Sequence, residues 1–203
     1  MIIIDENKLI AIGSSRLIYI HPDNNKKLIK VFKPSQTPEM RRKAIWYKRF
    51  QSLEKFNENK RDLIEHQKAR GKCHEAALSV CNVYGIEKTN HGDGLVEDHI
   101  CDIDGNTSIN LKYYVQNNGF KIVRSNIDDL FDIFSNNHIL FRDAYEMNIL
   151  VQQLETELRL VVVDGLGESN LIPYASLSKT LNARKLRHKK ERMIDRLSVT
   201  NVN

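Results

Sequence analysis

The stretch Ile139–Pro173, ILFRDAYEMNILVQQLETELRLVVVDGLGESNLIP, organises the interpretation of this 203-residue sequence. It places Asp143 and Asn148 five residues apart, and a later apolar run ends on Asp164. Carboxylate and carboxamide oxygens are the hard ligands that Mg²⁺ prefers in proteins. We therefore expect these three side chains to converge on a bound metal ion, although Asp164 lies in a later segment of the chain than the other two.

The order of these residues is that of a protein kinase. There, an Asp of the catalytic loop lies beside the attacking hydroxyl, an Asn five residues later binds Mg²⁺, and a strand-terminal Asp supplies the other metal ligand. Here a predicted hairpin, Ile149–Leu154 with Arg159–Val163, separates Asn148 from Asp164. This interpretation makes Asp143 the catalytic residue and assigns Mg²⁺ to Asn148 and Asp164. The alternative is a strand with polar ends, because Asp and Asn are ordinary turn residues.

A small-residue turn near the amino terminus suggests where phosphates could bind. Apolar segments on both sides of Gly13-Ser14-Ser15 predict a hairpin. Small residues let backbone N–H groups approach phosphates, so Gly13, Ser14 and Ser15 are candidate nucleotide contacts. A plain hairpin turn is the competing interpretation.

Lys30 lies between apolar neighbours in a predicted strand, Leu28–Phe32. A kinase keeps the lysine that contacts the α- and β-phosphates in such a place, paired with a helical glutamate. Thr37 and Pro38 predict a helix start, and Glu39 is the nearest acid that could pair with Lys30. The alternatives are an outward-facing strand lysine and a surface acid favoured by the helix dipole. Trp46, Phe50 and Leu53 form the expected apolar stripe of this helix.

Composition indicates a globular protein. Its net charge of +5 is compatible with an anionic partner but does not require one. Hydrophobic residues make up 41% and charged residues 28%, and no apolar run approaches the ~20 residues of a membrane span. Met1–Asp5 lacks the features of a signal peptide, so we expect a cytoplasmic protein. Three cysteines, Cys73, Cys81 and Cys101, are odd in number and widely spaced, which disfavours disulfides and paired-cysteine zinc sites.

The net charge of +5 is concentrated near the carboxyl terminus. Arg184–Arg196 contains seven Lys or Arg residues against two acids, within a predicted long helix, Ser176–Leu197. Such a helix could pack on the rest of the chain, cover an anionic ligand or bind nucleic acid, and a solvated basic face is the commonest meaning of such a run.

Together these patterns predict an α+β, protein-kinase-like bilobal fold in a single domain spanning residues 1–203. An antiparallel-sheet amino-terminal lobe would cover residues 1–100. An abbreviated, mainly helical carboxyl-terminal lobe, residues 101–203, would end in the basic helix. Only 39 residues follow Asp164, so we expect no full substrate platform, and the sequence does not identify a phosphoryl acceptor.

The sequence resembles the YrbL family, known as PhoP regulatory network proteins, over almost its whole length. The matching segments are Ile12-Gly13, Tyr19-Ile20-His21-Pro22, Ile29-Lys30-Val31, Glu39-x-Arg41-Arg42, Asp102-Ile103-Asp104-Gly105, Asn148-Ile149-Leu150 and Asp164-x-x-Gly167-Glu168-Ser169-x-Leu171-Ile172-Pro173. The resemblance implies a minimal kinase fold in a small bacterial protein and a link to envelope-stress or cation-responsive regulation.

Three residues depart from the kinase pattern. Tyr145 stands where the catalytic loop usually has a lysine, Gly165 replaces the aromatic residue after the metal aspartate, and Lys43 occupies a place where related helices carry the pairing acid. Losing an electrostatic clamp costs about 3 kcal/mol of transition-state stabilisation. Our leading hypothesis is an ATP- and Mg²⁺-binding phosphotransferase. The alternatives are a catalytically weak pseudokinase that binds a regulatory protein, and a basic nucleic-acid-binding module.

Overall fold

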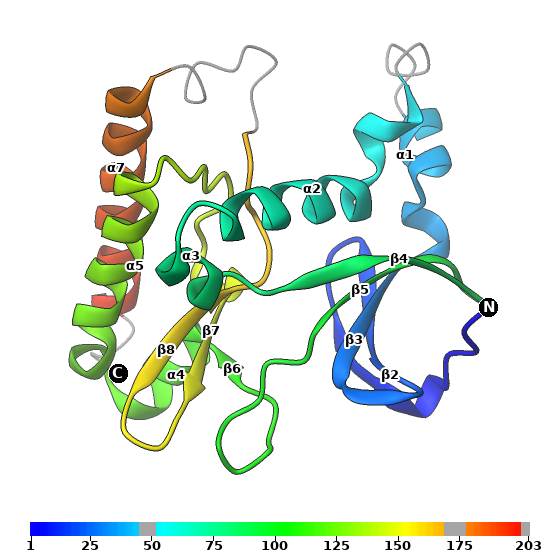
Figure 1. The fold of residues 1–203 in the computed structure, drawn as a ribbon, viewed down its shortest axis with the longest axis horizontal. Helices are drawn as coiled ribbons and strands as arrows, with labels where there is room; N and C mark the ends of the chain where they lie inside the picture. Colours follow the sequence, from blue (N-terminus) through cyan, green and yellow to red (C-terminus); the bar gives the residue numbers. More distant parts are fainter. Residues whose placement is uncertain (45–51, 169–177, 200–203) are drawn as a thin grey trace. The chain divides into compact units, whose positions relative to one another are not determined.

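The computed structural model describes residues 1–44, 52–168 and 178–199 (Figure 1). The chain divides into a first unit, Met1–Gln67 with Asn82–His99, and a second unit, Lys68–Cys81 with Ile100–Asn203. The boundary after His99 lies next to the expected one at residue 100. Residues 68–81, which we expected in the first lobe, belong to the second unit because Ala69, Ala76 and Val80 join its core. Trp46 and Phe50 of the expected apolar stripe lie outside the described residues.

The first unit is built on an antiparallel sheet with the order β1-β2-β3-β5-β4. The predicted hairpin and the lysine-bearing strand are both confirmed. The strands are β1 (Leu9–Ile12), β2 (Arg16–His21), β3 (Asn24–Phe32), β4 (Val83–Thr89) and β5 (Gly92–Asp98). The expected helix start is also confirmed, as α1 covers Pro38–Ala44.

The two faces of this sheet differ in polarity. One face forms a small apolar core around Tyr19, Ile29, Val31 and Val96. Because successive strand residues point to opposite faces, Lys30 faces the other side. There the first turns of α2 (Glu58–Arg70) bury polar residues three or four apart, the spacing of one helix face: Asn59, Asp62 and His66.

α2 is tied to the sheet by hydrogen bonds as well as by packing. Asn59 Nδ2 donates to the carbonyls of Lys30 at 3.1 Å and of Asp93 at 3.2 Å. Arg16 Nη1 donates to Asp62 Oδ2 at 2.7 Å. Since buried polar groups cost free energy unless they are paired, these bonds allow a polar helix face to cover the sheet.

The second unit contains a three-stranded sheet, β6-β7-β8, with helices packed against its strands. The predicted hairpin is confirmed, with Ile149 opposite Val162. The strands are β6 (Ile109–Asn110), β7 (Ile149–Gln153) and β8 (Leu158–Val162), and the helices are α3 (His74–Ser79), α4 (Leu111–Asn118), α5 (Arg124–Asn136) and α7 (Lys179–Val199). Short 3₁₀ turns cover Glu6–Lys8, Pro34–Gln36, Leu53–Phe56, Phe120–Val123 and Glu146–Asn148.

The basic carboxyl-terminal helix packs on the rest of the second unit. α7 runs beside α5 (Figure 1). Its apolar residues Leu186, Met193 and Leu197 are buried in the same core as Ile127, Phe134 and the hairpin. The sequence left open whether this helix packs on the rest of the chain, covers an anionic ligand or binds nucleic acid. The structure shows that it packs on the second unit.

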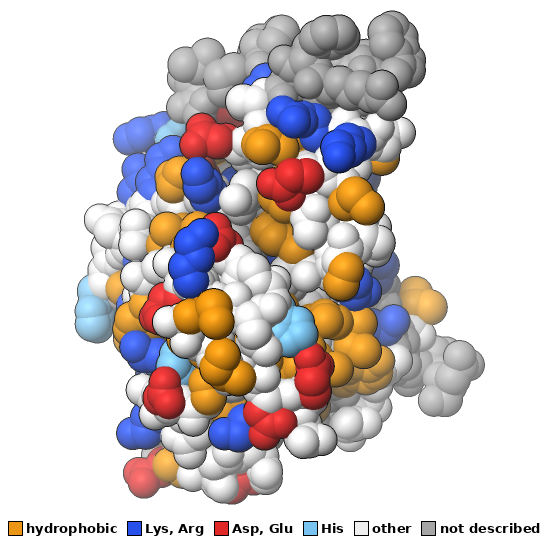
Figure 2. Space-filling model, turned by 90° about the vertical axis from the view of Figure 1, so that its right-hand side faces the viewer, with side chains coloured by type: hydrophobic (Ala, Val, Ile, Leu, Met, Phe, Trp, Pro, Cys, Tyr) orange, Lys and Arg blue, Asp and Glu red, His pale blue; other side chains and the backbone are white. Residues whose placement is uncertain are grey.

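The surface is mixed in character. On the face drawn in Figure 2, apolar side chains lie in small groups among basic and acidic ones. Within the described residues, no helix is both long and apolar enough to cross a membrane.

Candidate functional site

Asp143, Asn148 and Asp164 come together in the second unit around Gly165. Asn148 Nδ2 donates to the carbonyl of Asp143 at 2.8 Å. The Asp143 amide donates to the carbonyl of Gly165 at 2.9 Å, and the Gly165 amide donates to Asp164 Oδ1 at 2.6 Å. The loop, the turn and the strand end that carry the three candidate residues thus form one hydrogen-bonded cluster.

A tight turn sets the five-residue spacing between Asp143 and Asn148. The Tyr145 amide donates to the Asp143 carbonyl at 2.7 Å, and the Asn148 amide donates to the Tyr145 carbonyl at 2.9 Å. The Val163 amide then donates to the Asn148 carbonyl at 3.0 Å, which joins the turn to the end of β8. Since the Asn148 side chain uses its nitrogen as donor, its amide oxygen is the atom that could bind a metal ion.

Gly165 is required by this close approach. Its φ is +85°, a region that L-residues rarely adopt, and a Cβ there would lie 2.7 Å from the Asp143 carbonyl oxygen. The same Cβ would lie 2.9 Å from Asp143 Cβ and 3.0 Å from Asn148 Nδ2. The departure from the kinase aromatic residue therefore has a local reason, because a larger residue would separate the candidate ligands.

The Asp143 carboxylate is partly exposed and has a cationic neighbour. Arg142 Nε donates to Asp143 Oδ2 at 2.7 Å, and the Asp143 side chain keeps 43% of its surface exposed. The second carboxylate oxygen can accept a hydrogen bond from an incoming hydroxyl group. The arrangement suits a carboxylate that orients an acceptor.

The donor set fits Mg²⁺ only if an amide takes part. In residues 1–44, 52–168 and 178–199, no cluster of three or more His, Cys, Asp or Glu side chains is placed to hold a metal ion. Asp164 and Asn148 together offer carboxylate and amide oxygens, which are hard ligands of the kind that bind Mg²⁺ alongside phosphates and water.

Lys30 is buried and pairs with a residue that sequence reasoning did not consider. Its Nζ lies 2.8 Å from Glu97 Oε2, and the two side chains are only 4% and 2% exposed. Glu39 lies exposed in the first turn of α1, which matches the surface-acid alternative, and the pairing of Glu39 with Lys30 is not observed. The reason is strand register: Lys30 is opposite Leu95 and Leu28 is opposite Glu97, which places Lys30 and Glu97 diagonally on one face.

The turn at Gly13-Ser14-Ser15 is tied to the helices of the first unit. The Gly13 amide donates to the Arg16 carbonyl at 2.9 Å, while the Ser15 hydroxyl donates to Glu58 Oε2. Gly13 and Ser14 are exposed. A Cβ on Gly13 would meet only ordinary contacts, so the geometry is that of a hairpin turn, and phosphate contact there stays a prediction.

Glu58 links this turn to both helices. It accepts from Ser15 and lies 2.5 Å from Arg41 Nη1. Burial raises the pKa of Glu58, but the hydrogen bonds from Ser15 and Arg41 and the charge of Arg16 outweigh burial, so this pKa lies below its ordinary value.

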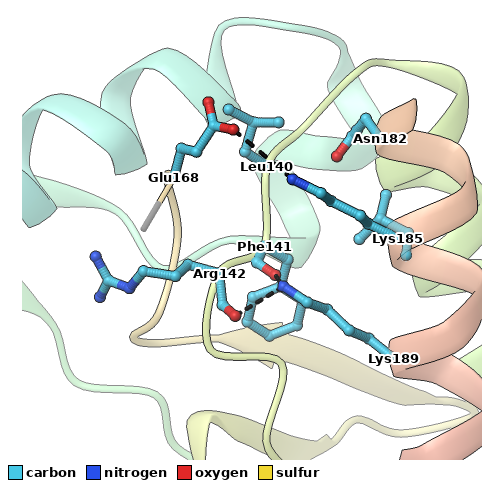
Figure 3. A pocket seen from close by; sticks show the side chains of 9 residues that line it. Leu140, Phe141, Arg142, Glu168, Asn182, Lys185 and Lys189 are labelled. Atoms are coloured by element: carbon cyan, nitrogen blue, oxygen red, sulfur yellow. Dashed lines mark hydrogen bonds and ion pairs between the residues drawn. The ribbon is translucent and has the colours of Figure 1, made fainter. Parts of the chain in front are cut away.

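α7 contributes contacts to the loop that carries Asp143. Lys189 Nζ donates to the carbonyls of Phe141 at 2.6 Å and Arg142 at 2.7 Å (Figure 3). Arg196 Nη2 lies 2.8 Å from Glu146 Oε2 and its guanidinium 5.5 Å from the Tyr145 ring centroid. Sequence reasoning missed Lys189, because a run of seven basic residues does not single out one.

Comparisons with known proteins show which family the chain resembles and which fold it shares. The family model described as PhoP regulatory network protein YrbL matches residues 2–198. The YrbL proteins of Escherichia coli (strain K12) and Shigella flexneri are each 28% identical over 193 residues, covering 91% of this chain and 82% of the relative.

Solved protein-kinase structures share the fold. A mutant PknI kinase domain of Mycobacterium tuberculosis matches with a TM-score of 0.54 and 14% identity, over 95% of this chain and 73% of that chain. A double mutant of the same domain gives a TM-score of 0.57 at 13% identity, over 95% and 71%. A Rad53 structure in complex with AMP-PNP gives 0.54 at 12% identity, over 96% of this chain and 47% of that one. At such identities the likeness shows the fold alone.

Proposed function

Because the chain belongs to the YrbL family and has a protein-kinase-like α+β fold, we propose that it binds ATP with Mg²⁺ and transfers a phosphoryl group. The observation that carries this proposal is the cluster of Asp143, Asn148 and Asp164 around Gly165. A strand with merely polar ends would not need the turn 143–148 and the strand end 163–165 to be held within hydrogen-bonding distance of each other.

Each residue has a distinct role in the proposal. Asn148 and Asp164 hold Mg²⁺, which neutralises charge on the phosphates, and Lys30 contacts the α- and β-phosphates. Backbone groups of Gly13, Ser14 and Ser15 are secondary phosphate contacts. Glu97 takes the place that we first gave to Glu39, because it orients the Lys30 ammonium.

Asp143 acts on the acceptor. Its carboxylate takes a hydrogen bond from the acceptor hydroxyl and receives the proton as the hydroxyl oxygen bonds to the γ-phosphorus. The bond between that phosphorus and the β–γ bridging oxygen breaks, and ADP leaves with the electron pair. Arg142 limits the rotation of the Asp143 carboxylate. The carboxylate therefore loses less rotational entropy when the acceptor binds.

A specific observation favours a second candidate, a pseudokinase that binds nucleotide or a regulatory protein without efficient transfer. Tyr145 is 56% exposed and replaces the lysine that usually neutralises the transferred phosphate. Arg196 lies beside its ring but is engaged by Glu146. The loop therefore lacks the cation that a kinase presents at this position.

The nucleic-acid hypothesis receives less support. At least four of the seven basic residues in 184–196 have partners within the second unit. These partners are Glu168 for Lys185, the loop carbonyls for Lys189, Asp128 for Lys190 and Glu146 for Arg196. Fewer cations of this helix are left to contact phosphates.

Calorimetric titration with AMP-PNP, with and without Mg²⁺, tests the proposed binding. We expect Mg²⁺ to strengthen binding to the wild type. Asp164→Ala should lose at least tenfold of this gain, since it removes a charged metal ligand. Asp129→Ala, an exposed aspartate on α5 of the same unit, is the matched control and should bind as the wild type does.

The outcomes separate the candidates. A wild type that binds no nucleotide refutes the proposal. Binding together with release of the γ-phosphate of ATP, abolished by Asp143→Ala, supports the phosphotransferase. Binding without any turnover, in the presence of a screen of hydroxyl acceptors, supports the pseudokinase.

A further inference from the structure

Three polar residues of α7 lie seven positions apart and contact the loop that carries Asp143. Asn182 Nδ2 donates to the Ile139 carbonyl at 3.2 Å, Lys189 Nζ donates to the Phe141 and Arg142 carbonyls, and Arg196 binds Glu146. Seven residues are about two helical turns, so the three share one face and are about 10 Å apart. They meet the loop in chain order, which means that α7 runs alongside it.

Lys189 is the central contact, and its side chain lines a cavity between the helix and the loop. A cavity of about 30 Å³ lies between α7 and the loop, lined by residues that include Leu140, Glu168, Lys185 and Lys189. Figure 3 shows the Lys189 side chain reaching from the helix to the loop backbone. The loop is thus held here by an ammonium group beside a cavity.

Placing the Lys189 ammonium here costs free energy, because the charged group is partly removed from water. Burial lowers the pKa of Lys189, the charge of Asp143 opposes this, and the charges of Lys185 and Arg142 act with burial, so the pKa lies below its ordinary value. Lys189 is half-buried, and a charge that is partly removed from water is tolerated when its hydrogen bonds are made. Two strong acceptors at 2.6 and 2.7 Å meet that need.

The two carbonyls fix the direction in which the chain enters Asp143. Each peptide group is planar, so holding the carbonyls of Phe141 and Arg142 holds two successive peptide planes immediately before that residue. After Asp143, Arg196 holds Glu146 and the ring of Tyr145. Asp143 lies between two attachments to the same helix.

We propose that Lys189 is a positioning residue for Asp143, through which α7 keeps the catalytic loop in the arrangement that phosphoryl transfer needs. The inference rests on the proposed function for its effect on catalysis. Its structural part, that Lys189 holds the loop, can be tested without any nucleotide.

Amide hydrogen exchange on the nucleotide-free full chain tests the structural part. In Lys189→Met, which keeps most of the side-chain volume, we expect the amides of Asp143, Tyr145 and Asn148 to exchange at least tenfold faster, while amides of β7 and β8 keep their rates. Lys190→Met is the matched control. Lys190 follows Lys189 directly in the sequence, but its ammonium pairs with Asp128 of α5, 2.9 Å away, and not with the loop. Lys189→Arg, which retains several donors, should restore slow exchange.

Unchanged loop exchange in Lys189→Met overturns the inference. A uniform acceleration over the whole second unit, equal to that of Lys190→Met, also overturns it, because it shows only a packing role. If Lys189→Met does not fold, Lys189→Gln is compared with Lys189→Arg on the same amides. Equal loop rates in those two variants refute the role of the charged donor.

Kinetics test the catalytic part. We expect Lys189→Met to lower kcat for ATP turnover about tenfold while AMP-PNP affinity changes less than threefold, since the residue positions Asp143 and not the metal ligands. Full turnover with a loosened loop refutes the positioning role. A wild type that binds no nucleotide refutes the proposed function, but the exchange result still decides whether Lys189 holds the loop.

Discussion

Replacing Gly165 by alanine tests whether the candidate site depends on the close approach of this residue to the turn that carries Asp143 and Asn148. Alanine at φ +85° costs about 1–2 kcal/mol in backbone strain. Its Cβ also falls 2.7 to 3.0 Å from three atoms of Asp143 and Asn148, and such crowding typically costs about 1–3 kcal/mol. We expect Gly165→Ala to destabilise the protein by about 2–5 kcal/mol and to weaken Mg²⁺-dependent binding of AMP-PNP.

Gly105→Ala provides a control with the same backbone conformation. Gly105 has φ +84°, and a Cβ there meets nothing within 4 Å. Backbone strain alone should lower the free energy of unfolding of this variant, by about 1–2 kcal/mol. The difference between the variants, about 1–3 kcal/mol, isolates the crowding. At a urea dependence of about 2 kcal/mol per molar, it corresponds to about 0.5–1.5 M in the unfolding midpoint followed by far-UV circular dichroism.

Equal midpoints for the two variants would refute the reasoning, because they would show that the atoms around Gly165 yield without cost. Unaltered nucleotide binding in Gly165→Ala would refute the link between the close approach and the site, provided that the wild type binds.

Two further predictions concern charged pairs. Lys30→Met should lower the free energy of unfolding in urea by about 3–5 kcal/mol, because the buried Glu97 loses its cationic partner. Adding Glu97→Leu should recover part of this loss. A double variant that is no more stable than Lys30→Met would contradict the prediction. Burial raises the pKa of Glu146, but hydrogen bonds from Arg196 and a backbone amide outweigh burial and lower it from its ordinary 4.5. A lowered carboxylate pKa stabilises the folded state above the unfolded value and ceases to do so as the pH falls through the folded one. The stability advantage of the wild type over Glu146→Gln should therefore shrink as the pH falls below 4.5, and an advantage that is constant from pH 6 to about pH 3 would show that the shift does not stabilise the fold.

Features encoded by near neighbours could be predicted from the sequence. The hairpin β7–β8 follows from two apolar runs separated by polar residues, and the five-residue spacing of Asp143 and Asn148 is closed by a local turn. The strand that carries Lys30 was predicted because a short run of apolar, largely β-branched and aromatic residues follows a turn, and both signals are visible without knowing any partner strand.

The features that sequence reasoning missed depend on pairing between distant segments. Glu39 was considered as a partner of Lys30 because it is the nearest acid in sequence, whereas the register of β3 against β5 selects Glu97. Lys189 was one of seven basic residues, and only the facing of α7 toward the loop distinguishes it. The spacing of Asn182, Lys189 and Arg196 was visible, but it carries meaning only once the loop beside it is known.

The sequence by itself determined which elements form and in which order the candidate residues follow one another, because hydrophobic periodicity and turn chemistry act over a few residues. The tertiary structure alone decided that Glu97 pairs with Lys30, that only glycine fits at residue 165, and that Lys189 binds the loop before Asp143. The physical reason is that strand register and helix facing are set by the burial of whole surfaces, to which each of these residues contributes only a small part.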